Sequence, residues 1–296
     1  MRGCVAVCRS RRLSVHRLIR LYPLFLAGLV FGAARRFGCA MLDRGDSASV
    51  AELLKTSLFE VLMLPASLGP NLFVLNGPCW SLFFEMAVSL LYAGLLFRMG
   101  TRMLTVVAAG FGLLLVFAAF QNGSLEMGLK WHWFHGGMAR TGFSFTLGML
   151  IARGLDRPPR ISWLALLPAG ALLAILLVQA PFGPLFDLSI VMVVAPVLVW
   201  TAARFDPPAL LQPAARWLGE LSYPVYAIHY PLMFLWLFFA KRAHVPVLLQ
   251  LIAYVVLVGV LAGLLNRYWD QPMRRRLNAW LAGERRGAIG APALHE

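Results

Sequence analysis

Long blocks of apolar residues dominate the chain, and charged residues do not interrupt them at the intervals typical of a surface helix. Most blocks approach the roughly 20 residues that an α-helix needs to cross a bilayer. The pattern predicts an all-α, polytopic bundle of transmembrane helices, about eight spans in one integral membrane domain over residues 1–296. The predicted spans are 21–37, 80–97, 103–120, 138–153, 162–179, 185–203, 222–240 and 246–266.

A further apolar segment, residues 50–66, differs because it carries Glu52, Lys55 and Glu60. Three charges in so short a segment disfavour a lipid-facing span. We therefore place this segment as an interfacial or re-entrant helix.

Composition and charge support a membrane protein and exclude other classes. Hydrophobic residues make up 60% of the chain and charged residues 14%, which is more apolar surface than a soluble domain buries. The net charge is +14. With the N-terminus in the cytoplasm, 19 of the 27 Lys and Arg residues fall in predicted cytoplasmic segments, as the positive-inside rule requires. Both termini are then cytoplasmic, and without a nucleic-acid-binding motif we expect no nucleic acid partner.

A carboxylate inside an apolar block is the most informative polar position. Glu85 lies early in the second predicted span, where a charge costs on the order of 2.5–3.5 kcal/mol and normally faces a cavity or a partner. Turn residues from Asn76 precede it, Trp80 fits an interfacial aromatic, and Ser81 is suited to capping the helix. Two interpretations stay open: a structural carboxylate paired with an arginine such as Arg140, or a polar pocket open to the outer face.

A cationic patch lies just before the first span. Arg17 and Arg20 are three residues apart and therefore share a helix face. Two guanidinium groups at that spacing can grip phosphate oxygens. An ordinary topology anchor would explain the same charges.

A polar stripe lies within the seventh predicted span. Ser222, Tyr226 and His229 are spaced by four and three residues and share a helix face. Such a stripe usually faces the bundle interior, either for interhelical hydrogen bonding or for a functional role. In a predicted outer loop, His132 and His135 have no third ligand nearby, so we expect no metal site.

Taken together, these motifs resemble the acyltransferase family 3 of membrane proteins. The order and spacing of the motifs fit that family across most of the chain. The three resembling segments are 17–23, 76–85 and 222–231, and looser matches follow at 140–148 and 267–274.

The resemblance implies a bacterial inner-membrane enzyme that moves an acyl group, often acetyl, from acyl-CoA to a hydroxyl of a glycan, lipid or small molecule. Acyl-CoA is then a co-substrate, and no cofactor is bound. Arg17 and Arg20 match the family's cytoplasmic Arg-x-x-Arg, which is associated with acyl-CoA. The candidate catalytic residues are Glu85 and His229. The candidate residues of the acceptor side or the interior are Asn76, Trp80, Ser81, Arg140, Ser222 and Tyr226.

The sequence departs from the family at its start. Family members usually carry two further helices before the Arg-x-x-Arg motif, and the first of these carries an arginine and the histidine taken to act in catalysis. Here the apolar blocks begin only after Arg17. A misassigned start, a truncated remnant or helices supplied by another chain would each explain the difference.

An alternative function is a transporter or flippase-like component for a glycan or lipid intermediate. Intramembrane Glu and His residues also suit a proton relay. A third interpretation is a degenerate fragment that inserts into the membrane without activity.

Because the family's N-terminal histidine has no counterpart before Arg17, we predict that these 296 residues by themselves transfer acyl groups poorly or not at all. The measurement is product formation by the purified chain with acetyl-CoA and a glycan acceptor. Robust acetylation would contradict this prediction.

Overall fold

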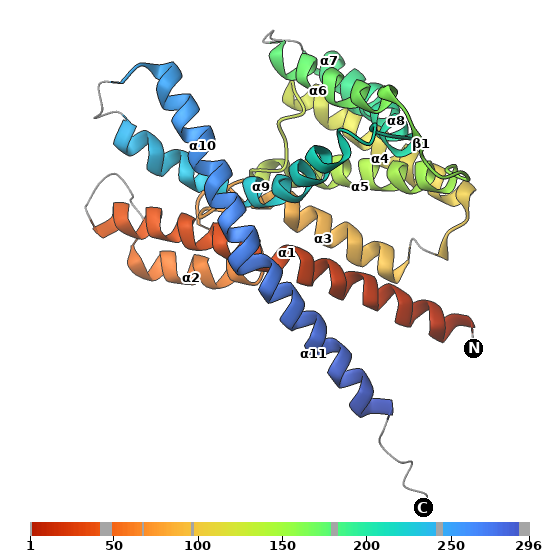
Figure 1. Cartoon of the computed structure of the whole chain (residues 1–296), viewed down its shortest axis with the longest axis horizontal. Coiled ribbons are helices and arrows are strands. Elements are labelled where there is room, and N and C mark those ends of the chain that lie inside the picture. Colours follow the sequence, from red (N-terminus) through yellow and green to blue (C-terminus); the bar gives the residue numbers. More distant parts are fainter. Residues whose placement is uncertain are drawn as a thin grey trace, which may run out of the picture. The chain divides into compact units, whose positions relative to one another are not determined.

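The computed structural model describes residues 2–41, 49–66, 68–95, 98–178, 183–240 and 245–289, and their regular structure is almost entirely helical (Figure 1). The predicted all-α class is confirmed. In chain order the helices and strands are α1 (Arg2–Met41), α2 (Val50–Val61), α3 (Cys79–Gly94), α4 (Thr101–Asn122), α5 (Phe134–Arg153), β1 (Arg160–Ile161), α6 (Leu167–Leu177), α7 (Pro184–Ser189), α8 (Ala195–Arg204), β2 (Phe205–Asp206), α9 (Gln212–Ala240), α10 (Val247–Leu265) and α11 (Gln271–Ile289).

Four helical segments among the described residues are long and apolar enough to cross a membrane: Val15–Cys39, Thr101–Asn122, Pro184–Arg204 and Val247–Ala282. Each predicted span coincides with helical structure, but the predicted count of about eight spans is not confirmed. Two predicted spans correspond to helices shorter than the roughly 20 residues a crossing needs, namely Cys79–Gly94 and Trp163–Leu177. The ends of these two predictions, residues 96–97 and 179, lie outside the described residues.

The other two predicted spans that are not among the four lie in α5 and α9. Both helices have the length of a span. Polar residues lower their hydropathy: α5 contains His135 and Arg140, and α9 contains the Tyr226–His229 stripe together with two prolines. Polar side chains that suggested function, such as Arg140, Tyr226 and His229, therefore lower the hydropathy by which a membrane span is recognised.

The helix predicted in residues 50–66 is α2, which has 12 residues. A capping box fixes its start: the Ser49 side chain accepts a hydrogen bond from the Glu52 backbone N–H, and the Glu52 side chain accepts from the Ser49 N–H. These hydrogen bonds hold the pKa of the exposed Glu52 carboxyl below its ordinary value. Glu60, by contrast, is completely buried.

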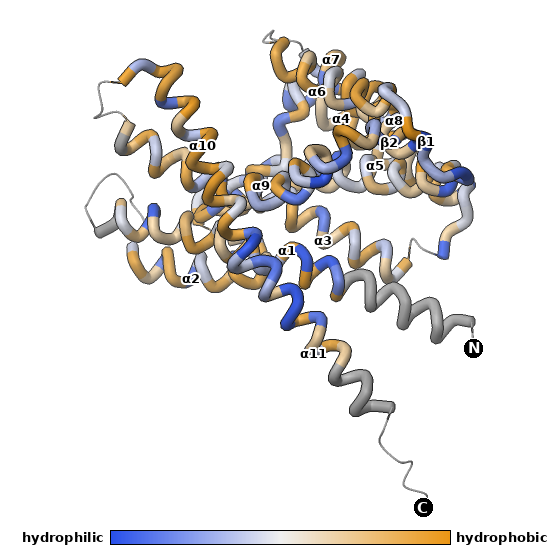
Figure 2. Tube along the Cα trace, viewed as in Figure 1, coloured by the Kyte–Doolittle hydropathy of each residue, from blue (hydrophilic) through white to orange (hydrophobic). Residues whose placement is uncertain are grey.

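The chain divides into two compact units, each described by itself. Unit 1 comprises residues 1–10 and 63–219, and unit 2 comprises residues 11–62 and 220–296. Apolar residues dominate the helices of both, whereas the start of α11 is hydrophilic (Figure 2).

The core of unit 1 lies between α4 and α5, which pack along much of their lengths (Figure 1). Leu115 of α4, Ala139 and Phe143 of α5, and Leu188 of α7 belong to one buried cluster. Small residues allow this close approach, because a Cβ atom at Gly142 would lie 2.7 Å from the Phe111 ring.

The core of unit 2 is built from helices that are distant in the sequence. Leu24 of α1, Ile228 of α9 and Val258 of α10 belong to one buried cluster. Unit 2 therefore joins the first helix of the chain to its last helices through apolar burial.

We predict that Gly142→Ala destabilises unit 1 by about 1–3 kcal/mol, because the added methyl group overpacks the contact with Phe111. Gly148→Ala on the same helix is the matched control, since nothing lies within 4 Å of a Cβ there, and alanine favours a helix by about 0.5–1 kcal/mol. Thermal unfolding in detergent measures both. Equal or lower stability of the Gly148 variant would contradict the proposed packing.

Candidate functional site

Unit 1 contains a pocket of about 470 Å³ next to the start of α3. The lining includes Trp80 and Arg140, which the sequence analysis selected separately. Other polar and aromatic lining residues come from the segment between α4 and α5: Asn122, Ser124, Glu126, Lys130 and Trp133. Two predicted acceptor-side residues are thus brought together across 60 positions of the sequence.

A tight turn places Trp80 at the pocket. The Cys79 N–H donates to the Asn76 carbonyl at 3.0 Å, and the Trp80 N–H donates to the Gly77 carbonyl at 3.2 Å. The turn expected before this helix is therefore present. The expected cap is not: the helix begins after Pro78, which offers no side-chain hydrogen bond. Ser81 lies inside the first turn, because the helix starts earlier than the sequence suggested.

Glycine allows the loop after α4 to lie against the Trp80 indole. Gly128 has φ +104°, and a Cβ atom there would lie 2.5 Å from the Trp80 ring. Gly137 of α5 is as close to its neighbours, since a Cβ would lie 2.6 Å from the Phe84 ring. Gly128 therefore lets the loop approach the Trp80 indole closely, and Gly137 does the same for α5 and the Phe84 ring.

Arg140 spans one side of the pocket. Its guanidinium carbon lies 5.7 Å from the centre of the Trp80 ring, and its Nη1 donates to the Leu125 carbonyl at 3.3 Å. Asp187 of α7 interacts with Arg140 electrostatically and accepts the Leu125 N–H at 2.9 Å. Asp187 is therefore a carboxylate whose negative charge acts on Arg140, and both interpretations of Glu85 left open by the sequence stay open.

Backbone hydrogen bonds join the segment before α3 to the segment before α5. The Leu72 N–H donates to the Leu129 carbonyl at 2.8 Å, and the Trp131 N–H donates to the Pro70 carbonyl at 3.0 Å. The Trp131 indole also donates to the Ala66 carbonyl at 3.0 Å. The loop that supplies Glu126 and Lys130 is held in place by these bonds.

The other predicted residues of this motif, Asn76, Ser81 and Glu85, are not among the residues that line this pocket. Asn76 is 1% exposed. Glu85 is half-buried on α3, and its backbone carbonyl accepts the Ser89 hydroxyl at 2.6 Å.

The pocket suits an oxygen-rich ligand with apolar faces. Trp80 and Trp133 offer flat apolar surface, while Lys130 and Arg140 offer charged donors. Glu126 and Asn122 add acceptors. This combination of rings and few polar groups is typical of a small-molecule site.

Unit 2 carries the remaining candidates. On α1, Arg17 is half-buried and Arg20 is exposed. The helix is fixed close to them, because the Tyr22 hydroxyl donates to the Val61 carbonyl at 2.9 Å. The cationic pair therefore lies on a helix held by tertiary contacts.

The His229 ring is oriented by its own helix. Its Nδ1 lies 2.8 Å from the Tyr226 carbonyl and 3.2 Å from the Val225 carbonyl. In the tautomer that donates from Nδ1 to these carbonyl oxygens, Nε2 is the nitrogen with a lone pair available to accept a proton. Tyr226 and His229 are half-buried, whereas Ser222 is exposed.

Sequence reasoning missed several residues of these sites. Asp187 and Lys130 lie near segment ends and had no motif around them. Trp133 was considered only as part of the pair His132 and His135, which do not line the pocket. The clustering of aromatic and charged residues at 126–135 could have indicated that this loop contributes to a site.

Comparison with known proteins agrees with the resemblance noted in the sequence. The model of acyltransferase family 3, described as an acyltransferase domain, matches residues 10–267. No curated protein and no solved structure matches the chain.

We predict that Gly128→Ala lowers the melting temperature of the protein in detergent more than Gly123→Ala does. Both positions have positive φ, so both substitutions strain the backbone. Only Gly128 lies against the Trp80 ring, whereas nothing lies within 4 Å of a Cβ at Gly123. A larger effect at Gly123 would show that the loop does not seat the indole.

Proposed function

Since the chain belongs to acyltransferase family 3, we propose that this integral membrane protein transfers an acyl group, often acetyl, from acyl-CoA to a hydroxyl of a glycan, lipid or small molecule. The observation that carries the proposal is the family match over residues 10–267. The structure supports it with a ligand-sized pocket around Trp80 and Arg140. The membrane is the bacterial inner membrane, with both termini in the cytoplasm.

The donor side of the proposal rests on α1. Arg17 and Arg20 share one face of this helix. Guanidinium groups bind phosphate oxygens through paired, charge-assisted hydrogen bonds. The phosphates of acyl-CoA supply the matching negative charge, so these arginines hold the donor at the cytoplasmic end of the helix.

The acceptor side rests on the pocket of unit 1. The Trp80 and Trp133 rings bind the apolar faces of a sugar or similar ligand, and Lys130 and Arg140 donate to its oxygens. Asn76 and Ser81 support the turn that carries Trp80.

The chemical step is attack of the acceptor hydroxyl oxygen on the thioester carbonyl carbon. A base removes the hydroxyl proton as the new C–O bond forms, and the C–S bond breaks to release CoA thiolate, which takes up a proton. Glu85 and the Nε2 atom of His229 are the candidate bases. A donor must also stabilise the carbonyl oxygen as it becomes negative.

The experiment that tests the proposal uses native membranes containing the protein, where helices supplied by another chain would also be present. We predict that label moves from the acetyl group of acetyl-CoA to a glycan or lipid of these membranes. Movement of a glycan or lipid intermediate across the bilayer without CoA, and without labelling, would instead favour a transporter.

We predict that replacing Arg17 and Arg20 together by alanine weakens acetyl-CoA binding by the purified chain about tenfold or more, because charge-assisted hydrogen bonds to phosphate are lost. The matched control replaces Arg157 and Arg160, two exposed arginines of another predicted cytoplasmic segment. Calorimetry or filter binding measures both variants. If the two double variants bind acetyl-CoA with equal affinity, Arg17 and Arg20 are topology anchors and not ligands of the donor.

A further inference from the structure

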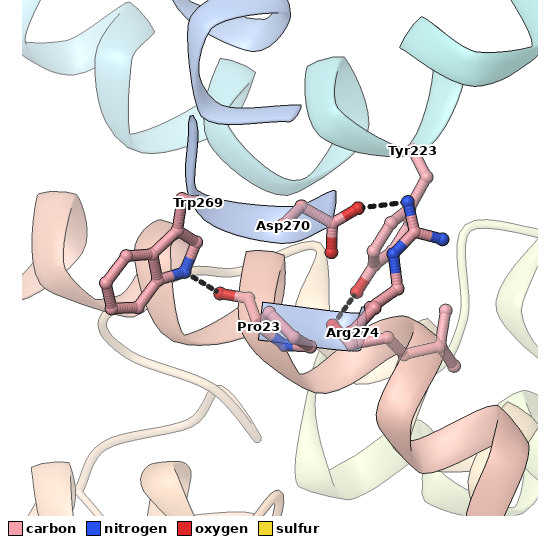
Figure 3. A network of polar contacts seen from close by, with 6 residues as sticks. Pro23, Tyr223, Trp269, Asp270 and Arg274 are labelled. Carbon is pink, nitrogen blue, oxygen red and sulfur yellow. Dashed lines mark hydrogen bonds and ion pairs between the residues drawn. The ribbon is translucent and has the colours of Figure 1, made fainter. Parts of the chain in front are cut away.

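The segment that joins α10 to α11 is anchored on α1 beside the cationic pair. The π-helical turn Asn266–Asp270 forms the junction, and such turns are frequent at functional sites. The Trp269 Nε1 atom donates to the Pro23 carbonyl at 2.8 Å (Figure 3). From α9, the Tyr223 hydroxyl donates to the Leu21 carbonyl at 2.5 Å. All of these residues belong to unit 2.

Asp270 is the buried centre of this junction. It is 1% exposed, and its Oδ2 atom lies 2.5 Å from Nη2 of Arg274, one turn further along (Figure 3). Its Oδ1 atom is buried and has no hydrogen-bond partner among the described residues. Arg20 interacts with the same carboxylate electrostatically. A buried carboxylate is costly without positive charge around it. The Asp270 carboxylate is therefore stabilised by its ion pair with Arg274, and the positive charge of Arg20 on α1 acts in the same direction.

Both arginines remain accessible to solvent beside the buried Asp270 carboxylate. The Arg274 side chain is 32% exposed, and Arg20 is exposed. The carboxylate pairs with one guanidinium group, that of Arg274, and a second positive charge, that of Arg20, also acts on it. The cluster therefore keeps excess positive charge and donors that face solvent, as an anion-binding site requires.

We propose that Arg274 is a further phosphate-binding residue of the acyl-CoA site, and that Asp270 positions Arg274 and Arg20 for this role. The proposal rests on the function proposed above. Both residues lie beyond the region that the family model matches, and within the looser resemblance at 267–274. The ligand chemistry is the phosphate groups of the CoA moiety, which carry the negative charge that the cluster lacks.

Protection of the wild-type chain against arginine modification tests the proposal without any substitution. The full chain in detergent is treated with phenylglyoxal, and the modified arginines are identified by mass spectrometry. We predict that acetyl-CoA protects Arg274, whereas acetyl-pantetheine, which has the thioester but no phosphates, does not. Arg275 is the internal control, because it is the adjacent arginine and is exposed.

Each result of that experiment decides the matter. Unprotected Arg274 in a chain that binds acetyl-CoA overturns the inference and leaves the proposed function standing. A chain that does not bind acetyl-CoA at all overturns both. Protection by phosphatidylglycerol micelles but not by acetyl-CoA would assign the cluster to lipid phosphate and would also overturn it. Acetyl-dephospho-CoA, which lacks the 3′-phosphate, then locates the contact. If it still protects Arg274, this arginine binds the pyrophosphate, and if it does not, Arg274 binds the 3′-phosphate. Either result supports the proposal.

Matched variants give the second measurement. We predict that Arg274→Ala weakens acetyl-CoA binding about tenfold or more, while Arg275→Ala, which removes the same charge from the next position, changes it less than about threefold. Equal losses for the two variants would overturn the inference. If Arg274→Ala does not fold, the protection experiment on the wild-type chain decides.

Asp270→Asn separates positioning from a merely structural role. The substitution keeps the shape of the side chain and removes its charge. We predict weaker binding of acetyl-CoA with unchanged binding of acetyl-pantetheine, because only the phosphate contacts depend on the arginines. Equal weakening for both ligands would show that Asp270 only stabilises the fold.

Discussion

A charged group removed from water requires a partner, and this constraint explains the polar architecture of the chain. In unit 1, Arg140 lies between a carbonyl, an indole ring and the Asp187 carboxylate. In unit 2, Asp270 forms an ion pair with Arg274, and the positive charge of Arg20 acts on the same carboxylate. In each case helices distant in the sequence are brought together around one charge. The apolar helices supply the cohesion, and these charges lie where helices distant in the sequence have packed together.

An arginine that interacts with a carboxylate of the protein can still bind a ligand. The charge of Asp187 acts on Arg140, yet Arg140 still lines the pocket with Lys130. Arg274 is paired with Asp270 but remains partly exposed. A guanidinium group has five donors, so one carboxylate can fix its position without using all of them. Arginine thus serves at both places as a positioned donor that is held by the protein and available to a ligand.

Glycine sets the geometry around the indole of Trp80 in a way that charge cannot. Gly128 and Gly137 bring backbone against the aromatic rings of α3, where any larger residue would collide. Close packing therefore seats the Trp80 indole against the Gly128 loop and the Phe84 ring against Gly137 of α5. The orientation of the rings in the pocket follows from these contacts as much as from the helix that carries Trp80.

The sequence alone determined the class of the protein, because the length and polarity of apolar blocks are local properties of the chain. It also determined the resemblance to the acyltransferase family, the turn before α3 and the helix face shared by Arg17 and Arg20. The predicted count of about eight spans is not confirmed among the described residues, because α3 is short and the polar stripe of α9 lowers its hydropathy.

Only the tertiary structure decided which distant side chains meet. Spacing within a helix says nothing about a residue 47 positions away, so the balance of Arg140 by Asp187 could not be read from the sequence. Nor could the contact that brings Asp270 and Arg274 to the helix of Arg20. Those pairings arise from the packing of helices, which depends on the shapes of all the apolar faces at once.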